Sequence, residues 1–253
     1  MLDGVVLVTG AGQGIGRAVA LGVGRRGAAV AAVDIRPEGA LQTCNSINEA
    51  GGRAVAITAD TSCTSAITGA FEQAERALGP LTGLVCAGMR RHYAPAELLT
   101  DEQWSMVIGD GLSGYFRCAR EAARRMLPRA RGSIVFVTST ASSSAIVNGA
   151  AYVAAKAGIA GLTRQLGCEW ADRGLRTNAV APGYTPTEGA HRKLEPEEAK
   201  RLIPIGRVAA AAEIAEACLF LLSDQASYIT GQEIVVDGGM VGSRIFGRKS
   251  PSA

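Results

Sequence analysis

The chain has 253 residues, of which 47% are hydrophobic and 19% charged, enough apolar material for a large core. No apolar run reaches the ~18 residues that a membrane-spanning helix needs, and the first apolar run starts too early for a signal peptide. A net charge of +3 is too small to indicate nucleic-acid binding. Six scattered cysteines without a C-x-x-C pair favour reduced thiols in a cytoplasmic protein over disulfides or a metal site.

The chain opens with a strand signal, a glycine turn and a helix start. Val5–Val8 is apolar, Thr9-Gly-Ala-Gly-Gln-Gly-Ile-Gly16 follows it, and a helical segment begins at Arg17. Glycine lets the backbone approach a pyrophosphate, whose charge suits the free N–H groups at the start of a helix. The segment therefore predicts a dinucleotide site that includes Gly10, Gln13, Gly14, Ile15 and Gly16.

A second apolar run, Ala28–Val33, ends at Asp34. A carboxylate at this position can accept hydrogen bonds from the adenosine ribose and repels a 2′-phosphate, which favours NAD over NADP. Arg36 stands two residues further on and can hold such a phosphate, so NADP remains the alternative.

Further strand and helix signals alternate along the chain. Strands are expected at 53–59, 81–86, 133–138, 175–180 and 233–236, and helices at 38–50, 64–78, 102–127, 149–172 and 210–223. This alternation predicts a parallel seven-stranded sheet with helices on both faces, in one domain spanning 1–253. The segment 184–207, rich in Pro, Glu and Lys, follows the sixth strand and is a candidate substrate lid.

The central chemical signal is formed by Ser139, Tyr152 and Lys156. Tyr152 and Lys156, at i and i+4, share one face of a helix. An ammonium placed there lowers the cost of forming a phenolate, so the tyrosine can take a proton from an alcohol or give one to an alkoxide. The spacing alone is also typical of a surface pair, and the glycine turn upstream is what favours catalysis.

These motifs, in this order, resemble the short-chain dehydrogenase/reductase family from Val5 to Met240. The matching residues are Thr9-Gly-x-x-x-Gly-Ile-Gly16, Asp60, Ala87-Gly88, Ser139/Tyr152/Lys156, Asn178-Ala-Val-Ala-Pro182-Gly183 and Ile229-Thr-Gly-Gln with Asp237-Gly-Gly239. The resemblance implies a doubly wound Rossmann-type sheet and an NAD(P)-dependent oxidoreductase acting on CH–OH groups without a metal.

The resemblance also implies residue roles. Tyr152 is the expected acid/base, Lys156 binds the nicotinamide ribose and assists the tyrosine, and Ser139 orients the substrate oxygen; Ser142, Ser143 and Ser144 are alternatives in the same run. Asp60 is expected at the adenine, and the nicotinamide is expected against Pro182, Gly183 and Thr187. Thr61, Ala87, Gly88 and Thr185 complete the expected cofactor site. Relatives of this kind assemble as homotetramers or homodimers through their long helices.

Two positions depart from the family pattern. The fourth strand ends Val85-Cys86-Ala87-Gly88, where the family usually has Asn-Asn-Ala-Gly. Gly111 stands where the family commonly has an asparagine that anchors a water next to the lysine. We hypothesise that water fills this space and that Asp110 or Ser113 partly substitutes, so that Gly111→Asn leaves activity unchanged or raises it.

The favoured function is an NAD-dependent dehydrogenase of a secondary alcohol. Arg36 and the basic run Arg90-Arg91-His92 keep an NADP-dependent 3-oxoacyl-thioester or polyketide-type ketoreductase as the alternative. A non-catalytic dinucleotide-binding regulator is weakly supported by Gly111 and opposed by the complete Ser/Tyr/Lys set. The substrate pocket is expected from 89–93, 141–149 and 184–207, which includes His191, and the identity of the substrate stays open.

Overall fold

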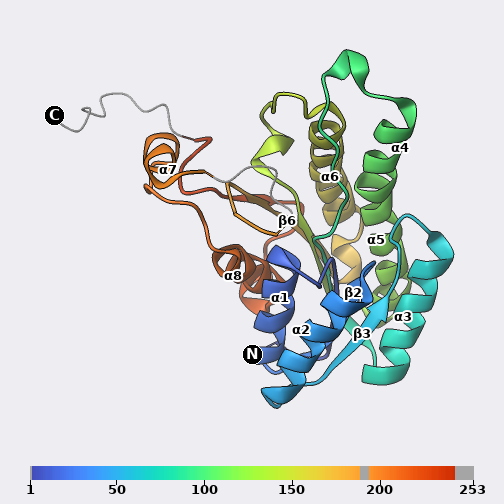
Figure 1. The fold of residues 1–253 in the computed structure, drawn as a ribbon. Coiled ribbons are helices and arrows are strands. Elements are labelled where there is room, and N and C mark those ends of the chain that lie inside the picture. The colour runs from blue at the N-terminus through green and yellow to red at the C-terminus, as the bar shows by residue number, and fades with distance from the viewer. Residues whose placement is uncertain (1, 189–193, 243–253) are drawn as a thin grey trace.

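The computed structural model describes residues 2–188 and 194–242. It confirms a seven-stranded, all-parallel sheet in the order β3-β2-β1-β4-β5-β6-β7 (Figure 1). The strands are β1 (Val5–Thr9), β2 (Ala29–Asp34), β3 (Ala54–Thr58), β4 (Leu81–Cys86), β5 (Gly132–Val137), β6 (Leu175–Pro182) and β7 (Glu233–Val236).

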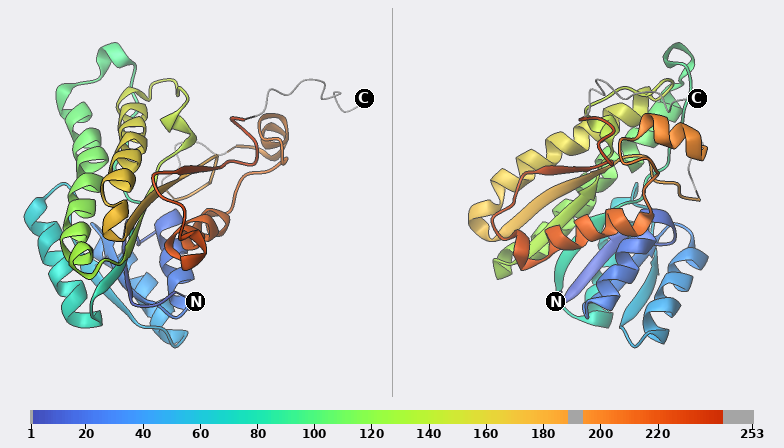
Figure 2. Two further views of the ribbon diagram at one scale, coloured as in Figure 1. Left: turned by 180° about the vertical axis from the view of Figure 1, so that it is seen from behind. Right: turned by 90° about the vertical axis from the view of Figure 1, so that its left-hand side faces the viewer.

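Helices cover both faces of this sheet, as Figures 1 and 2 show. One layer contains α1 (Gly14–Arg25), α2 (Pro37–Glu49) and α8 (Ala211–Leu222), and the other contains α3 (Thr64–Leu78), α5 (Leu112–Met126) and α6 (Ala150–Glu169). Of two further helices, α4 (Asp101–Asp110) packs against α5 and α6, whereas α7 (Pro196–Leu202) stands apart from both layers (Figure 1). No helix in the described part of the chain is both long and apolar enough to span a membrane.

The strands are apolar throughout because both of their faces are buried. In β1, Val5 and Leu7 point into the core beneath α3 and α5, whereas Val6 and Val8 point into the core beneath α1 and α8. All five residues of β1 are buried, so this strand fixes both helix layers to the centre of the sheet.

Two features of the helices differ from the sequence-based expectation. The helix expected over 102–127 is two helices, because Gly111 has a ψ of −85° and separates α4 from α5. The expected lid, 184–207, contains the helix α7, which stands apart from both helix layers (Figure 2). Its residues 189–193, with His191, lie outside the described residues.

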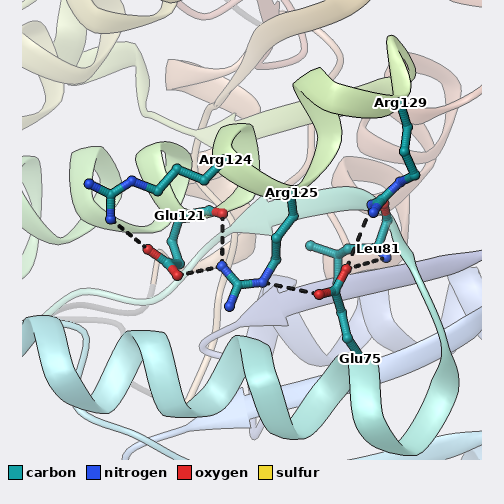
Figure 3. A network of polar contacts seen from close by, with 6 residues as sticks. All are labelled: Glu75, Leu81, Glu121, Arg124, Arg125 and Arg129. Carbon is teal, nitrogen blue, oxygen red and sulfur yellow. Dashed lines mark hydrogen bonds and ion pairs between the residues drawn. The ribbon is translucent and has the colours of Figure 1, made fainter.

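A polar network joins α3 to α5 (Figure 3). Glu121 is buried and its carboxylate pairs with Arg124 and Arg125. Arg125 Nε also lies 3.2 Å from Glu75 Oε2. The other oxygen of Glu75 accepts the backbone N–H of Leu81 at 3.1 Å, which connects both helices to the start of β4. This network holds one helix layer in register with the sheet.

Candidate active site

The direction of strand addition reverses between β1 and β4, and this is where ligands bind in sheets of this kind. Two glycines make the crevice narrow at its base. Gly10 has a φ of +67°, and a Cβ on it would lie 2.5 Å from Gly88 Cα. Beside this contact, the Ala87 N–H donates to the Thr9 carbonyl at 3.2 Å. Only glycine allows the turn after β1 and the turn after β4 to come this close.

The glycine turn ends at the N-terminus of α1, where backbone N–H groups have no partner within the helix. A carboxylate already occupies one of them, because the Gly14 N–H donates to Glu188 Oε2 at 3.2 Å. The same donors and the positive end of the helix dipole suit a phosphate oxygen. The turn therefore fits the pyrophosphate of a dinucleotide, with Glu188 as an anion that stands in for it.

A groove of about 360 Å³ extends from this turn across the carboxyl ends of the central strands. It brings together most of the cofactor residues predicted from the sequence, namely Gly10, Gln13, Gly14, Ile15, Gly16, Asp34, Asp60, Thr61, Ala87, Gly88 and Thr187. Five predicted residues are not part of its lining: Tyr152, Lys156, Pro182, Gly183 and Thr185. Pro182 ends β6, and the Thr185 hydroxyl bonds back to the Gly183 carbonyl at 3.3 Å, so these two residues shape the chain that leads to Thr187.

Asp34 ends β2 in the lining of the groove and is held in place by backbone donors. Its Oδ2 accepts the Gly12 N–H at 2.9 Å and its Oδ1 accepts the Arg36 N–H at 3.0 Å. The Arg36 Nε is 3.8 Å from Oδ1, and its side chain is largely exposed. The carboxylate thus has a fixed position and only partial neutralisation, which disfavours a 2′-phosphate beside it.

An ion-pair cluster that sequence reasoning missed lies on the opposite wall of the groove. Arg90 Nη2 is 3.7 Å from Asp60 Oδ2, and Arg90 Nε is 3.5 Å from Asp110 Oδ2. Asp110 is buried at the C-terminal end of α4, an unfavourable place for a negative charge, and it also accepts the Thr61 hydroxyl and the Arg90 N–H. A hydrogen bond from Ser62 lowers the pKa of Asp60, with Arg90 acting in the same direction.

Lys156 projects from α6 into the core beside Tyr152. Its Nζ donates to the Val137 carbonyl at 2.7 Å and lies 5.8 Å from the centre of the Tyr152 ring. The Tyr115 hydroxyl donates to the same carbonyl at 3.2 Å. Burial lowers the pKa of Lys156 to about 7, and the positive charge of Arg91 contributes to the same shift. A lysine with this pKa can gain or lose a proton near neutral pH.

Ser139 and Tyr152 complete the predicted set. Ser139 is half-buried, and its hydroxyl accepts the Ala141 N–H at 3.2 Å, which leaves its own proton available to a substrate oxygen. The neighbouring serines are used elsewhere, because Ser142 donates to Glu233 at 2.9 Å and Ser144 donates to the Thr140 carbonyl at 2.8 Å. The Tyr152 ring is nearly buried and lies 5.9 Å from the ring of Tyr93.

The two departures from the family pattern have different structural outcomes. Cys86 is buried, and its thiol hydrogen-bonds Cys118 and Thr9, so it links β4 to α5 and β1. At Gly111, the two proposed substitutes have other contacts: Asp110 bonds Thr61 and Arg90, and Ser113 lines a surface hollow with Phe116. Their part in a water-mediated relay stays a prediction. The Val137 carbonyl is the group that holds Lys156.

Comparison with known proteins decides the family. Residues 10–241 match the family model described as enoyl-(acyl carrier protein) reductase. The chain is 36% identical to D-threitol dehydrogenase of Mycolicibacterium smegmatis, covering 94% of this chain and 93% of that one. The chain belongs to the short-chain dehydrogenase/reductase family.

Two further similarities bear on the activity. The chain is 39% identical to cis-4-hydroxycyclohexanecarboxylate dehydrogenase of Sinomonas cyclohexanicum, covering 93% of this chain and 95% of that one. A structure of an actinorhodin polyketide ketoreductase variant with NADPH superposes with a TM-score of 0.88 at 32% identity, covering 94% of this chain and 97% of that one. The chain is accordingly an oxidoreductase of this family that acts on CH–OH groups.

Proposed function

We propose that the chain is an NAD-dependent dehydrogenase that oxidises a secondary alcohol to a ketone, with Ser139, Tyr152 and Lys156 as its catalytic residues. The observation that carries this proposal is the position of Lys156 and Tyr152 on one face of α6, with the lysine buried and 5.8 Å from the tyrosine ring. The cofactor supplies the hydride acceptor when it is bound. The protein groups bind, orient and move the proton.

The proposed proton transfer uses the three side chains in distinct ways. Ser139 donates a hydrogen bond to the substrate oxygen and orients it. Tyr152 takes the hydroxyl proton as the carbinol carbon is oxidised, or returns it in the reverse direction. Lys156 stabilises the phenolate by its charge, and its fixed contact with the Val137 carbonyl keeps the ammonium beside the tyrosine.

NAD is proposed over NADP because of the fixed carboxylate of Asp34. Both of its oxygens are held by backbone donors, so the charge cannot swing away from an approaching 2′-phosphate. Gly10 to Gly16 would hold the pyrophosphate, and Asp60 and Thr61 the adenine. The proposal includes a single domain with 184–207 as the substrate lid, a cytoplasmic location and a homotetramer or homodimer.

The decisive experiment replaces the proposed acid/base. Tyr152→Phe should lower kcat by roughly 10²- to 10⁴-fold, the range that general acid–base catalysis contributes. Nicotinamide absorbance follows turnover on a panel of secondary alcohols and ketones, and quenching of protein fluorescence follows NADH binding. We expect unchanged NADH affinity. Retained turnover with intact binding would refute the assignment of Tyr152.

The alternative is an NADP-dependent ketoreductase of oxoacyl thioesters or polyketides. The similarity to the actinorhodin ketoreductase supports this reading, as does the position of Arg36 in the lining of the groove. Measuring kcat/KM with NAD(H) and NADP(H) in parallel separates the two. A preference for NADP(H) that disappears in Arg36→Gln would favour the ketoreductase.

A further inference from the structure

The groove carries a guanidinium that pairs with no carboxylate among the residues the structure describes. Arg91 follows β4, is exposed and lines the groove together with Thr187. Across residues 2–188 and 194–242, no Asp or Glu oxygen lies within 4.0 Å of its side chain as an ion pair. Its neighbour Arg90 is the opposite case, since it pairs with both Asp60 and Asp110.

Arg91 is anchored close to the proposed acid/base. Its side chain hydrogen-bonds Tyr93, whose ring lies 5.9 Å from that of Tyr152. The same loop is fixed at its far end, because the Ala94 N–H donates to the Asn148 carbonyl at 3.0 Å. The guanidinium is thereby held next to a tyrosine that packs on Tyr152.

A carboxylate at the start of β7 also acts on the lysine. Glu233, at the start of β7, accepts the Ser142 hydroxyl at 2.9 Å. Its charge raises the pKa of Lys156 whereas that of Arg91 lowers it, so both groups lie within electrostatic range of the lysine.

We propose that Arg91 binds an anionic group of the substrate, so that the preferred substrates are secondary alcohols or ketones that carry a carboxylate or similar oxyanion. This inference rests on the proposed function. The planar guanidinium presents several N–H donors in the geometry of a carboxylate, and an uncharged substrate would leave this charge without a counter-ion.

The test compares substrates that differ only in charge. Wild-type protein is assayed with NAD⁺ on 4-hydroxycyclohexanecarboxylate against its carboxamide, and on 3-hydroxybutanoate against 3-hydroxybutanamide. We expect higher kcat/KM for at least one of the carboxylates. Arg91→Gln should reduce the carboxylate-to-carboxamide ratio ~10- to 100-fold, mainly through KM, as for a lost hydrogen bond to a charged group. The ratio cancels any effect that Arg91 exerts on both substrates through Lys156.

Control variants and conditions separate binding of the substrate anion by Arg91 from other effects of this residue. Arg91→Lys should recover part of the ratio, and 0.5 M NaCl should weaken the wild-type preference. Arg53→Gln removes an equal charge just before β3 and should leave the ratio unchanged. Binding of cyclohexanecarboxylate to the NADH-bound protein, measured by calorimetry, gives a readout without turnover and should weaken in Arg91→Gln.

Three outcomes would overturn the inference. The first is turnover of the carboxamides without any preference for the carboxylates. The second is an equal loss on both members of each pair in Arg91→Gln. The third is a loss confined to the affinity for NAD⁺, which would assign the guanidinium to the cofactor phosphates. Failure of the proposed function looks different, because no alcohol or ketone of either charge would then be turned over.

Discussion

Lys156, which we propose to be catalytic, carries a cost to stability. Its ammonium is buried, and the described contacts give it a single hydrogen-bond acceptor, the carbonyl of Val137. Because the pKa of Lys156 falls from 10.5 to about 7, the folded protein binds fewer protons than the unfolded chain between these two pH values. The free energy of unfolding should therefore rise with pH across this window, and the burial cost is fully present below pH 7.

Replacing the lysine tests this assignment. Relative to wild type, cofactor-free Lys156→Met should gain most stability below pH 7, and the difference in Tm should narrow as the pH rises toward 10. Each pKa unit corresponds to ~1.4 kcal/mol, or roughly 3–5 °C in Tm for a domain of this size. Thermal unfolding of both proteins from pH 6 to 10 measures this difference in Tm. The matched control is Lys200→Met, which replaces an exposed lysine. A difference in Tm that does not change with pH would contradict the lowered pKa.

Gly111 leads to a second prediction at this scale, and here sequence and structure disagree. The family pattern favours Gly111→Asn with unchanged or higher activity. In the structure, a Cβ at this position would lie 2.7 Å from Met89 Cε and 2.8 Å from the Val107 carbonyl oxygen, which accepts the Gly111 N–H. The methionine end can move, whereas the carbonyl belongs to the last turn of α4.

We therefore expect Gly111→Asn to lose about 1–3 kcal/mol of stability, as overpacked sites do, without a gain in kcat/KM. Gly111→Ala carries the same Cβ and serves as the control for the amide. Urea unfolding and steady-state kinetics of both variants provide the measurement. An asparagine variant that is as stable as wild type and more active than the alanine variant would restore the family's relay at this position.

At the scale of elements, the network between α3 and α5 is the feature most sensitive to single changes (Figure 3). Glu121→Gln keeps the shape of the side chain but removes the charge that Arg124 and Arg125 share, leaving Arg125 with Glu75 alone. We expect a loss of about 1–3 kcal/mol in the free energy of unfolding, the value of hydrogen bonds to charged groups. Urea unfolding measures this loss. The control is Glu197→Gln, which removes one partner of the exposed Lys200–Glu197 pair on α7 and should have little effect. An equally small effect for Glu121→Gln would show that the network is not needed to hold the two helices.

Sequence patterns predicted the strands well and the helix break poorly, for physical reasons. The fourth strand was expected at 81–86 and is found at Leu81–Cys86, because a strand buried on both faces is apolar from end to end. The periodicity of 102–127 continues through Gly111, so it gives no sign of the interruption. A single glycine in a helical pattern is usually tolerated, and only the backbone geometry shows that this one ends a helix.

For the whole molecule, the sequence predicted the doubly wound architecture and most of the lining of the groove. It did so because glycine turns and strand-end carboxylates are local signals that a parallel sheet brings to one edge. The pairing of Arg90 with Asp60 and Asp110 was missed, since these residues are separated in the chain. Only the fold brings the end of α4 next to the segments that follow β3 and β4. The contact between Glu188 and Gly14 was missed for the same reason.

If the glycine turn binds the nucleotide as proposed, that last contact makes Glu188 a competitor for the site. The Gly14 N–H cannot donate fully to the Glu188 carboxylate and to a cofactor phosphate at once. A tethered group competes at an effective concentration that is commonly in the millimolar range. The apparent affinity for the nucleotide is then reduced in proportion to the fraction of time the donor is free. On this proposal, one acidic side chain 174 residues from the turn that it covers would set part of the rate of cofactor exchange.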